Sequence, residues 1–290
     1  MTYFRFNSPE LFIFHTRDDT PSQDRFYMHT HAFAELFCFL EGEGVFHVEG
    51  TSYPLQPGDI LLMRPGEAHY IQLNTDVPYE RICINFDTEV FKSLDPDRVL
   101  MQPLFGRKGG KQNLYRAQTG PCLDILRRMT EPGPGNRLNL LGNLMLVLQQ
   151  LHAAFSSGMD NASQPDTLEY RIIRYINKNL AKELSLQSLC EIFFVSRTQL
   201  CKCFKEVTGT SIGSYISVKR LLTARELLLQ GIKPTEVFSA CGYRDYSTFF
   251  RAYTKLFGHT PRQEQSEQYP LTPDTRILIG QHAGILSDRL

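Results

Sequence analysis

The sequence predicts a two-domain chain, in which an all-β domain with flanking helices precedes an all-α domain. Residues 26–86 alternate apolar and polar side chains in short runs separated by glycine and proline turns, a pattern typical of a small barrel or sandwich. Residues 167–257 have helical spacing instead, and the polar segment SSGMDNASQPD between the two regions is typical of a linker. A chain of 290 residues is long enough for two such domains.

The expected boundaries follow from these changes in pattern. They are a barrel over 1–110, helices that pack on the barrel over 111–157, a linker over 158–166, a helical domain over 167–265, and a tail of no assigned role over 266–290. Within the second part, residues 114–129 and 138–155 have helical spacing and are separated by EPGPGN. Residues 138–155 are apolar around most of the helix, so we expect burial on several sides, against the barrel or against a second subunit.

Composition excludes several classes of protein. The chain is 42% hydrophobic and 21% charged, which is the balance of a globular protein and excludes disorder throughout. No run approaches the roughly 18 apolar residues of a membrane span, and the first ten residues lack the features of a signal peptide, so we expect a cytoplasmic protein without a membrane partner. The seven cysteines are scattered without a C-x-x-C pair, and we expect reduced core thiols.

Charge is distributed unevenly along the chain. Residues 1–165 carry 14 Lys and Arg against 19 Asp and Glu, whereas residues 166–262 carry 15 against 8. This asymmetry predicts that only the C-terminal part meets a polyanion.

A degenerate repeat lies within the helical part. The segments FVSRTQLCKCFKEVTGTS and GYRDYSTFFRAYTKLFGHTP each place a capping residue, Ser196 or Asp245, before a helix-period apolar stripe that a glycine ends. Equivalent apolar and glycine positions are 49 residues apart. Each copy follows a short helical segment, 186–193 or 235–241, so the pattern predicts two helix-turn-helix units.

The segment between the two units, SIGSYISVKRLLTARELLLQ, predicts a linking helix about 28 Å long, at about 1.5 Å per residue. Such a helix can set two recognition helices about one turn of B-DNA apart. The faces opposite the apolar stripes would then meet double-stranded DNA. These faces carry Arg197, Thr198, Cys201, Lys202 and Lys205 in the first copy, and Tyr246, Ser247, Phe250, Arg251 and Lys255 in the second.

The segment KRLLTARELLLQGIKPTEVFSACGYRDYSTFFRAYTKLFGHTP resembles the signature of the AraC-type transcription regulators, and the likeness extends over about 95 residues. The resemblance implies sequence-specific DNA binding by a homodimer that responds to a small-molecule effector. It also implies which side chains face the bases. These are Thr198, Cys201 and Lys202 in the first helix, and Tyr246, Ser247 and Arg251 in the second.

The N-terminal part resembles the cupin barrel that many of these regulators use as a sensor. His29, His31, Glu35 and Gly42 match its first motif, and Gly58, Pro65-Gly66 and His69 approximate its second. The resemblance implies that His29, His31, Glu35 and His69 mark a pocket for a small polar effector, with a sugar as one candidate. The same four residues could hold iron, manganese, nickel or zinc, but we favour a polar pocket with no metal and no other cofactor.

Three functions fit these patterns. The favoured one is a ligand-responsive transcription regulator without catalytic activity, because only this function uses both domains. An alternative is a metal-dependent cupin enzyme, an isomerase or dioxygenase that uses the histidine and glutamate set. A third is a constitutive dimerisation module, which the polar residues at the barrel mouth argue against.

Overall fold

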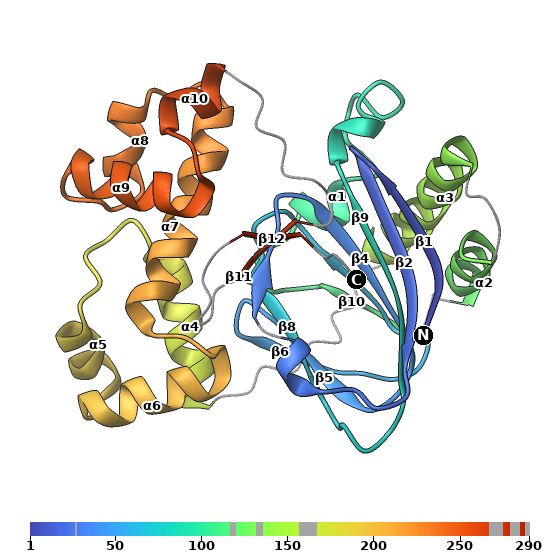
Figure 1. The fold of residues 1–290 in the computed structure, drawn as a ribbon, viewed down its shortest axis with the longest axis horizontal. Helices are drawn as coiled ribbons and strands as arrows, with labels where there is room; N and C mark the ends of the chain where they lie inside the picture. The colour runs from blue at the N-terminus through green and yellow to red at the C-terminus, as the bar shows by residue number, and fades with distance from the viewer. Residues whose placement is uncertain are drawn as a thin grey trace. The chain divides into compact units, whose positions relative to one another are not determined.

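The computed structural model describes residues 1–26, 28–116, 120–131, 136–156, 167–266, 275–278 and 285–287 (Figure 1). Their contacts define two compact units, one formed mainly by residues before 165 and the other mainly by residues after it. The predicted linker, 158–166, and most of the predicted tail lie outside the described residues. No helix among the described residues is long and apolar enough to cross a membrane.

The first unit contains an antiparallel sheet of six strands in the order β1-β2-β9-β4-β7-β10. Its strands are β1 (Thr2–Ser8), β2 (Leu11–Asp18), β4 (Ala34–Glu41), β7 (Ile60–Met63), β9 (Tyr79–Phe86) and β10 (Leu114–Tyr115). In the other sheet β5 pairs with both of its neighbours, β6 and β8. Those strands are β5 (Gly44–Val48), β6 (Thr51–Pro54) and β8 (His69–Leu73).

Successive side chains of a strand point to opposite faces of the sheet, so the strands contribute to two separate hydrophobic cores. On β4, Phe37 and Phe39 point into the core between the two sheets, whereas Leu36 and Cys38 point to the opposite face. That opposite face is covered by α2 (Gly120–Met129) and α3 (Arg137–Ser156), as Figure 1 shows. The core between the two sheets is therefore enclosed. A polar residue on the strand face that lines this core is removed from water.

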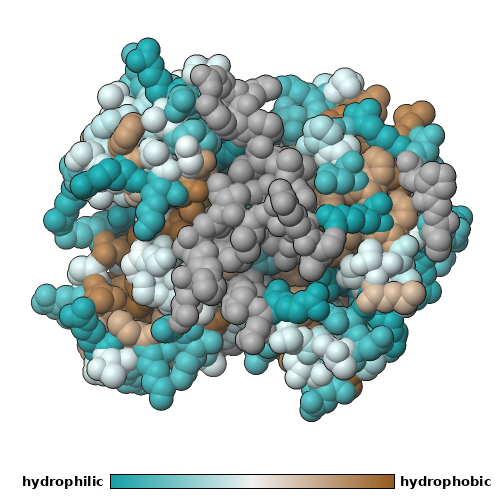
Figure 2. Space-filling model, in the orientation of Figure 1, coloured by the Kyte–Doolittle hydropathy of each residue, from teal (hydrophilic) through white to brown (hydrophobic). Residues whose placement is uncertain are grey.

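Helix α3 is apolar around most of its circumference, and only part of it faces its own sheet. Its buried residues fall on one stripe, namely Leu140, Leu144, Val147, Leu148, Leu151 and Ala154. Leu138 and Leu146 point away from that stripe and are 80% and 47% exposed. Exposed leucines on an otherwise packed helix leave apolar area available to a partner, and Figure 2 shows some brown, apolar surface in the region of α3.

One sequence prediction is wrong in this region. Residues 114–129 have helical spacing, yet Leu114 and Tyr115 form β10, which pairs with Leu61 and Ile60 of β7. The helix α2 begins only at Gly120. Both β10 side chains are buried, so pairing with a strand distant in sequence outweighs the local periodicity.

The first two strands, β1 and β2, also precede the region in which strands were predicted. The remaining short helices of this unit are η1 (Gln23–Arg25), η2 (Thr88–Phe91) and α1 (Gln102–Phe105).

The second unit is helical, so the predicted combination of an N-terminal β domain and a C-terminal helical domain is confirmed. Its helices are α4 (Leu168–Lys178), α5 (Leu186–Phe193), α6 (Arg197–Thr208), α7 (Ile212–Leu229), α8 (Pro234–Ala240), α9 (Tyr246–Phe257) and α10 (Pro261–Ser266). These bounds agree closely with the predicted helix-turn-helix pairs, α5–α6 and α8–α9, and with the linking helix α7. The unit also includes three short paired strands, β3 (His29–Thr30), β11 (Thr275–Leu278) and β12 (Ile285–Ser287).

Candidate nucleic-acid interface and ligand site

Helix α6 has the capping that the sequence predicted. The Ser196 side chain accepts a hydrogen bond from the Gln199 amide at 3.2 Å, and Gly209 ends the helix with φ +69°. Leu200 and Phe204 are fully buried, which fixes the rotation of the helix about its axis. The opposite face is thereby held toward solvent.

All five residues predicted on the outer face of α6 are exposed. Among them, Lys202 approaches Glu206 at 3.9 Å, a distance at which an exposed ion pair contributes little. Cys201 lies beside the buried Leu200 but points outward, so the prediction that all the cysteines are core thiols is wrong for Cys201. All seven cysteines are free, and four of them are buried.

Helix α9 repeats this design with a charged cap. The Asp245 carboxylate accepts hydrogen bonds from the Ser247 hydroxyl and the Thr248 amide, both at 2.7 Å. These two bonds lower the pKa of Asp245, so the cap is charged at neutral pH. Gly258 ends the helix with φ +79°.

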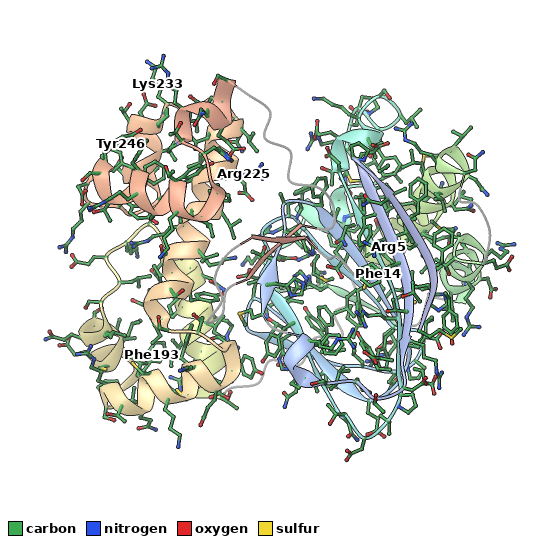
Figure 3. All side chains as sticks on the ribbon, viewed as in Figure 1. Arg5, Phe14, Phe193, Arg225, Lys233 and Tyr246 are labelled. Atoms are coloured by element: carbon green, nitrogen blue, oxygen red, sulfur yellow. The ribbon has the colours of Figure 1, made fainter. Side chains whose placement is uncertain are left out.

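The outer face of α9 is more aromatic than that of α6. Ser247, Arg251 and Lys255 are exposed, whereas Phe250 is only half-buried and Tyr246 is 37% exposed. Tyr246, labelled in Figure 3, meets the ring of Phe238 edge-on at 5.9 Å. Arg251 and Lys255 have no salt bridge to any residue that the structure describes, so both charges are available to a ligand.

Helix α7 is attached to the first helix-turn-helix unit by its side chains. The Tyr215 hydroxyl donates to Asn177 Oδ1 at 3.0 Å, and its ring packs edge-on against Phe204 of α6. Arg220 Nε donates to the Leu180 carbonyl at 2.9 Å. The ring contact joins α7 to α6, and the two hydrogen bonds join α7 to the C-terminal end of α4 and the residues just after it.

A buried ionic network attaches α7 to the second helix-turn-helix unit. Arg225, labelled in Figure 3, donates through Nε to Glu264 Oε1 of α10 at 3.0 Å. The other carboxylate oxygen of Glu264 accepts from the Tyr253 hydroxyl of α9 at 2.7 Å and meets His259 Nε2. Burial opposes ionisation of Glu264, but Arg225 and the hydrogen bonds outweigh it, and the pKa of Glu264 is lowered. One carboxylate thus joins three helices.

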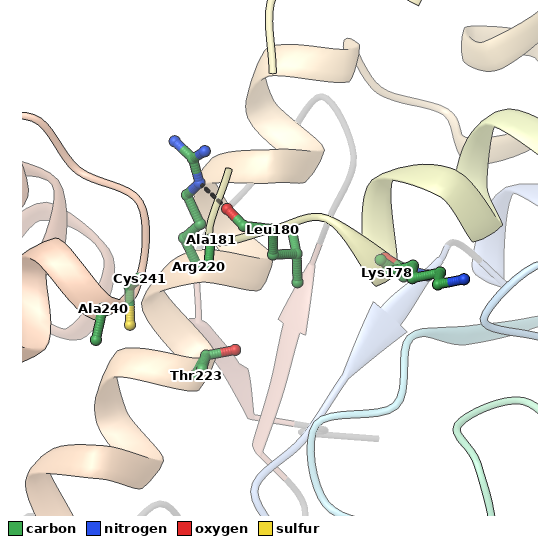
Figure 4. Close-up of a pocket in the computed structure, with 8 residues that line it drawn as sticks. Lys178, Leu180, Ala181, Arg220, Thr223, Ala240 and Cys241 are labelled. Atoms are coloured by element: carbon green, nitrogen blue, oxygen red, sulfur yellow. Dashed lines mark hydrogen bonds between the residues drawn. The ribbon is translucent and has the colours of Figure 1, made fainter. Parts of the chain in front are cut away.

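The second helix-turn-helix turns at Gly242, where φ is +81°. A Cβ at this position would lie 2.8 Å from the Leu180 carbonyl oxygen and 2.9 Å from Arg220 Nη2. Beside this corner is a pocket of about 270 Å³, shown in Figure 4. Arg220 and Thr223 of α7 and Cys241 at the end of α8 line it together with residues at the C-terminal end of α4 and just after it, so the pocket marks where α4, α7 and α8 meet.

Polar residues converge in the first unit, inside the space between its sheets. Glu35 shares the face of β4 that carries Phe37 and Phe39 and is 6% exposed, and His31 and His69 are 2% and 1% exposed. The ligand atoms of His31, Glu35 and His69 all lie within 4.8 Å of one another, so the structure brings together three of the four residues predicted to mark the effector pocket. The fourth, His29, lies on β3, which belongs to the second unit.

Hydrogen bonds orient this group. Glu35 Oε2 lies 2.6 Å from His31 Nε2 and 3.2 Å from His69 Nε2. Burial alone would keep the Glu35 carboxyl neutral, yet the bonds to both histidines hold its pKa well below the usual range. Phe46 stacks against His69 at 5.8 Å and closes one side of the group.

A second buried network supports the strand that carries His69. Arg107 binds both carboxylate oxygens of Glu67, at 2.8 and 2.9 Å, and Asn113 donates to the same carboxylate at 3.1 Å. Burial opposes ionisation of Glu67, but the Arg107 guanidinium outweighs it and lowers the pKa of that carboxyl. Since the Glu67 carbonyl accepts from His69 Nδ1 at 2.8 Å, this network also positions His69.

Two further polar residues of these sites were not predicted. Gln199 is exposed on the first turn of α6, where an amide side chain can read an adenine edge. The signal available in the sequence was the position of Gln199 directly before the buried Leu200. Asn85 on β9 is 3% exposed and lies directly opposite Glu35 on β4. No local pattern indicates Asn85, because its position depends on strand pairing.

The two units together define a class of protein, a two-part DNA-binding regulator with a β-sheet ligand domain and a pair of helix-turn-helix units. Family models agree with this division. Residues 14–171 match the model of the AraC-like ligand binding domain, and residues 189–266 match a helix-turn-helix domain. The chain belongs to the AraC family of DNA-binding transcription regulators.

Similar proteins are transcription regulators. The HTH-type transcriptional activator RhaS of Escherichia fergusonii is 22% identical over 251 residues, which are 83% of this chain and 88% of that protein. The Msm operon regulatory protein of Streptococcus mutans is 23% identical over 236 residues, 80% of this chain and 84% of that protein. The solved structure of ToxT from Vibrio cholerae O395 is 12% identical with a TM-score of 0.37, and the match covers 91% of this chain and 100% of that one.

Proposed function

We propose that the chain activates transcription by placing α6 and α9 in two adjacent major grooves of its operator. One observation carries this proposal. The same local design, with a capping side chain, a buried apolar stripe and an exposed cationic face, occurs twice and is joined by the single helix α7. We assign base contacts to Thr198, Cys201, Lys202, Tyr246, Ser247 and Arg251, and phosphate contacts to Arg197, Lys205 and Lys255. Phe250 is half-buried and serves chiefly to hold α9 in place.

The first unit acts as the sensor in this proposal. The buried group of His31, Glu35 and His69 offers donors and acceptors to a small polar effector, with a sugar as one candidate. The relatives that are named as activators suggest activation in place of repression. They also suggest that this chain has no catalytic activity. The site of action is the cytoplasm, where the DNA of a bacterial cell lies.

We further propose a homodimer formed through α3. The helix presents Leu138 and Leu146 to solvent while the rest of its apolar surface is packed on its own sheet. Two chains related by a two-fold axis could bury these leucines against each other.

DNA binding by the full-length chain tests the proposal. Footprinting on DNA from upstream of its gene and neighbouring genes, at fixed salt and with random DNA as competitor, should protect two adjacent major grooves per subunit. In the matched control, both Arg197 and Arg251 are replaced with alanine. This double substitution should abolish the specific footprint and leave the fold unchanged. Equal binding to specific and random DNA by the wild-type chain, with and without a panel of sugars, would refute the proposal.

A further inference from the structure

The corner of the first helix-turn-helix unit contains a residue that the fold does not require. Phe194 follows α5 with φ +55° and ψ +46°, which is a left-handed backbone conformation. A bulky side chain rarely adopts this conformation, because its Cβ comes too close to the following carbonyl oxygen. In the second unit the left-handed position of the corner is occupied by a glycine, Gly242. Glycine would adopt the backbone of Phe194 without strain.

The neighbours of Phe194 hold it in this conformation. Phe193, labelled in Figure 3, ends α5 and packs edge-on against an aromatic ring of α4, with 5.6 Å between ring centroids. The Val195 amide donates to the Cys190 carbonyl at 3.1 Å, which closes the turn after α5. Ser196 then caps α6. The positions of the two helices therefore impose the left-handed turn, whatever side chain stands at residue 194.

The Phe194 side chain makes little contact with its own unit. It is 93% exposed, more than any other large apolar side chain that the structure describes. An exposed ring buries almost no apolar area, so packing within the chain does not offset the backbone strain. Strained residues of this kind cluster at functional sites, where contact with a ligand accounts for them.

The position of Phe194 indicates what its ring meets. It lies two residues before Ser196, the N-cap of α6, and Arg197 and Thr198 on the first turn of that helix are exposed. In a helix-turn-helix the N-terminal residues of the recognition helix contact base edges, so a residue just before that helix lies close to the DNA. The apolar group that base pairs present in the major groove is the C5-methyl of thymine, which phenylalanine can contact.

We propose that Phe194 is a specificity-determining residue, whose ring contacts the C5-methyl group of a thymine in the major groove that α6 enters. The inference rests on the proposed function, because it requires α6 to lie in that groove. The exposed face of α6 carries Arg197, Lys202 and Lys205, and this positive charge favours DNA over another protein as the partner of the ring. Replacing Phe194 with glycine removes the contact and relieves the strain, so DNA affinity should fall while stability does not.

The probe is the DNA from upstream of the gene that footprinting identifies as the operator. Each thymine in the groove assigned to α6 is replaced in turn with deoxyuridine, which lacks only the methyl group. At one position the wild-type chain should lose affinity by about fourfold, the effect of one buried methyl group. Phe194→Gly should bind the thymine operator about tenfold more weakly and should not distinguish thymine from deoxyuridine. Phe194→Leu keeps an apolar side chain and should remain sensitive to the methyl group.

Urea denaturation separates loss of this contact from loss of the fold. Phe194→Gly should unfold at the wild-type midpoint or above it, because glycine adopts the left-handed conformation without strain. A clearly lower midpoint would assign Phe194 a structural role and overturn the inference. The matched control is Leu229→Asn, which removes a 60% exposed apolar side chain at the end of α7. This control should bind both forms of the operator as the wild-type chain does.

Three results of the binding measurements would also overturn the inference. The first is that no thymine methyl group affects binding by the wild-type chain. The second is an equal effect of deoxyuridine on the wild-type chain and on Phe194→Gly. The third is unchanged DNA affinity in Phe194→Gly with reduced transcription in vitro, which would assign the ring to a protein partner. Each of these results leaves the proposed function standing if the wild-type chain gives a specific footprint, whereas the absence of any specific footprint refutes both.

Discussion

Individual side chains on α6 and α9 should have different effects on DNA binding. Arg251 is exposed on the second proposed recognition helix, where a guanidinium can bind a guanine edge with two hydrogen bonds. Arg251→Ala should weaken specific binding by about 1–3 kcal/mol and relax the preference at one base position. Lys205→Ala should weaken binding to all sequences alike and reduce the salt slope by about 1.

Titrations on operator and scrambled DNA at several salt concentrations measure both effects. Lys92→Ala, which removes an exposed cation from the first unit, is the control. Unchanged binding in both variants would contradict the assignment of these helices.

Glu264 should confer a pH dependence on the stability of the second unit. Its pKa is lowered in the folded state, so its contribution is full above the unfolded value, near 4.5, and is lost as the pH falls through the folded value. Glu264→Gln leaves the buried Arg225 without its ion pair and should cost about 3–5 kcal/mol at pH 7. Hydrogen exchange in α7, α9 and α10 measures the loss. The difference between variant and wild type should shrink below about pH 4.5. A difference that is constant down to pH 2 would argue against an ionised Glu264.

At the scale of elements, the corner between α8 and α9 depends on Gly242. A Cβ there would contact the backbone oxygens of Leu180 and Ala181 at 2.8 and 3.0 Å, in addition to the strain of a positive φ. Gly242→Ala should therefore destabilise the second unit by about 2–4 kcal/mol, about 1 of which is due to φ. Gly258→Ala is the matched control, because Gly258 has φ +79° but no atom within 4 Å of its Cβ position. Urea denaturation should place the control between wild type and Gly242→Ala; equal losses in the two variants would show that the close approach is unimportant.

Elements were predictable from the sequence wherever the determining contacts are local. The caps Ser196 and Asp245 bond within three residues of themselves, so the bounds of α6 and α9 could be read from the sequence. Strand β10 could not, because Leu114 pairs with Leu61, 53 positions away. The convergence of His31, Glu35 and His69 was predicted through a motif, whereas Asn85 joins them only through the register between β4 and β9. Long-range pairing is therefore the information that one sequence did not supply.

For the whole molecule, exposed leucines on α3 should determine the oligomeric state. Leu138 is 80% exposed and Leu146 47% exposed, on a helix otherwise packed against its own sheet. Replacing both with glutamate would place like charges across a two-fold interface, so sedimentation velocity should show monomers at concentrations where the wild type is dimeric. The control pair Asn139→Glu and Asn143→Glu adds the same charge at exposed and half-buried positions of α3. A dimer that persists in the leucine variant would place the interface elsewhere.

Effector and DNA should be coupled through the complete chain, since a regulator that senses a ligand in one unit and binds DNA with another must link the two equilibria. An effector that raises operator affinity by a given factor must itself bind more tightly to the DNA complex by the same factor. Typical couplings of about 1–3 kcal/mol correspond to factors of about 5–150. A panel of monosaccharides is titrated against the full-length chain with and without operator DNA. These titrations measure the effect of each sugar on operator affinity and the effect of operator DNA on the affinity for the sugar. Glu35→Gln should remove the coupling while leaving effector-free DNA binding intact, because Glu35 lies inside the ligand domain and the DNA-facing residues lie on α6 and α9. If a sugar changes DNA affinity equally in wild type and Glu35→Gln, its binding site lies outside the group of His31, Glu35 and His69.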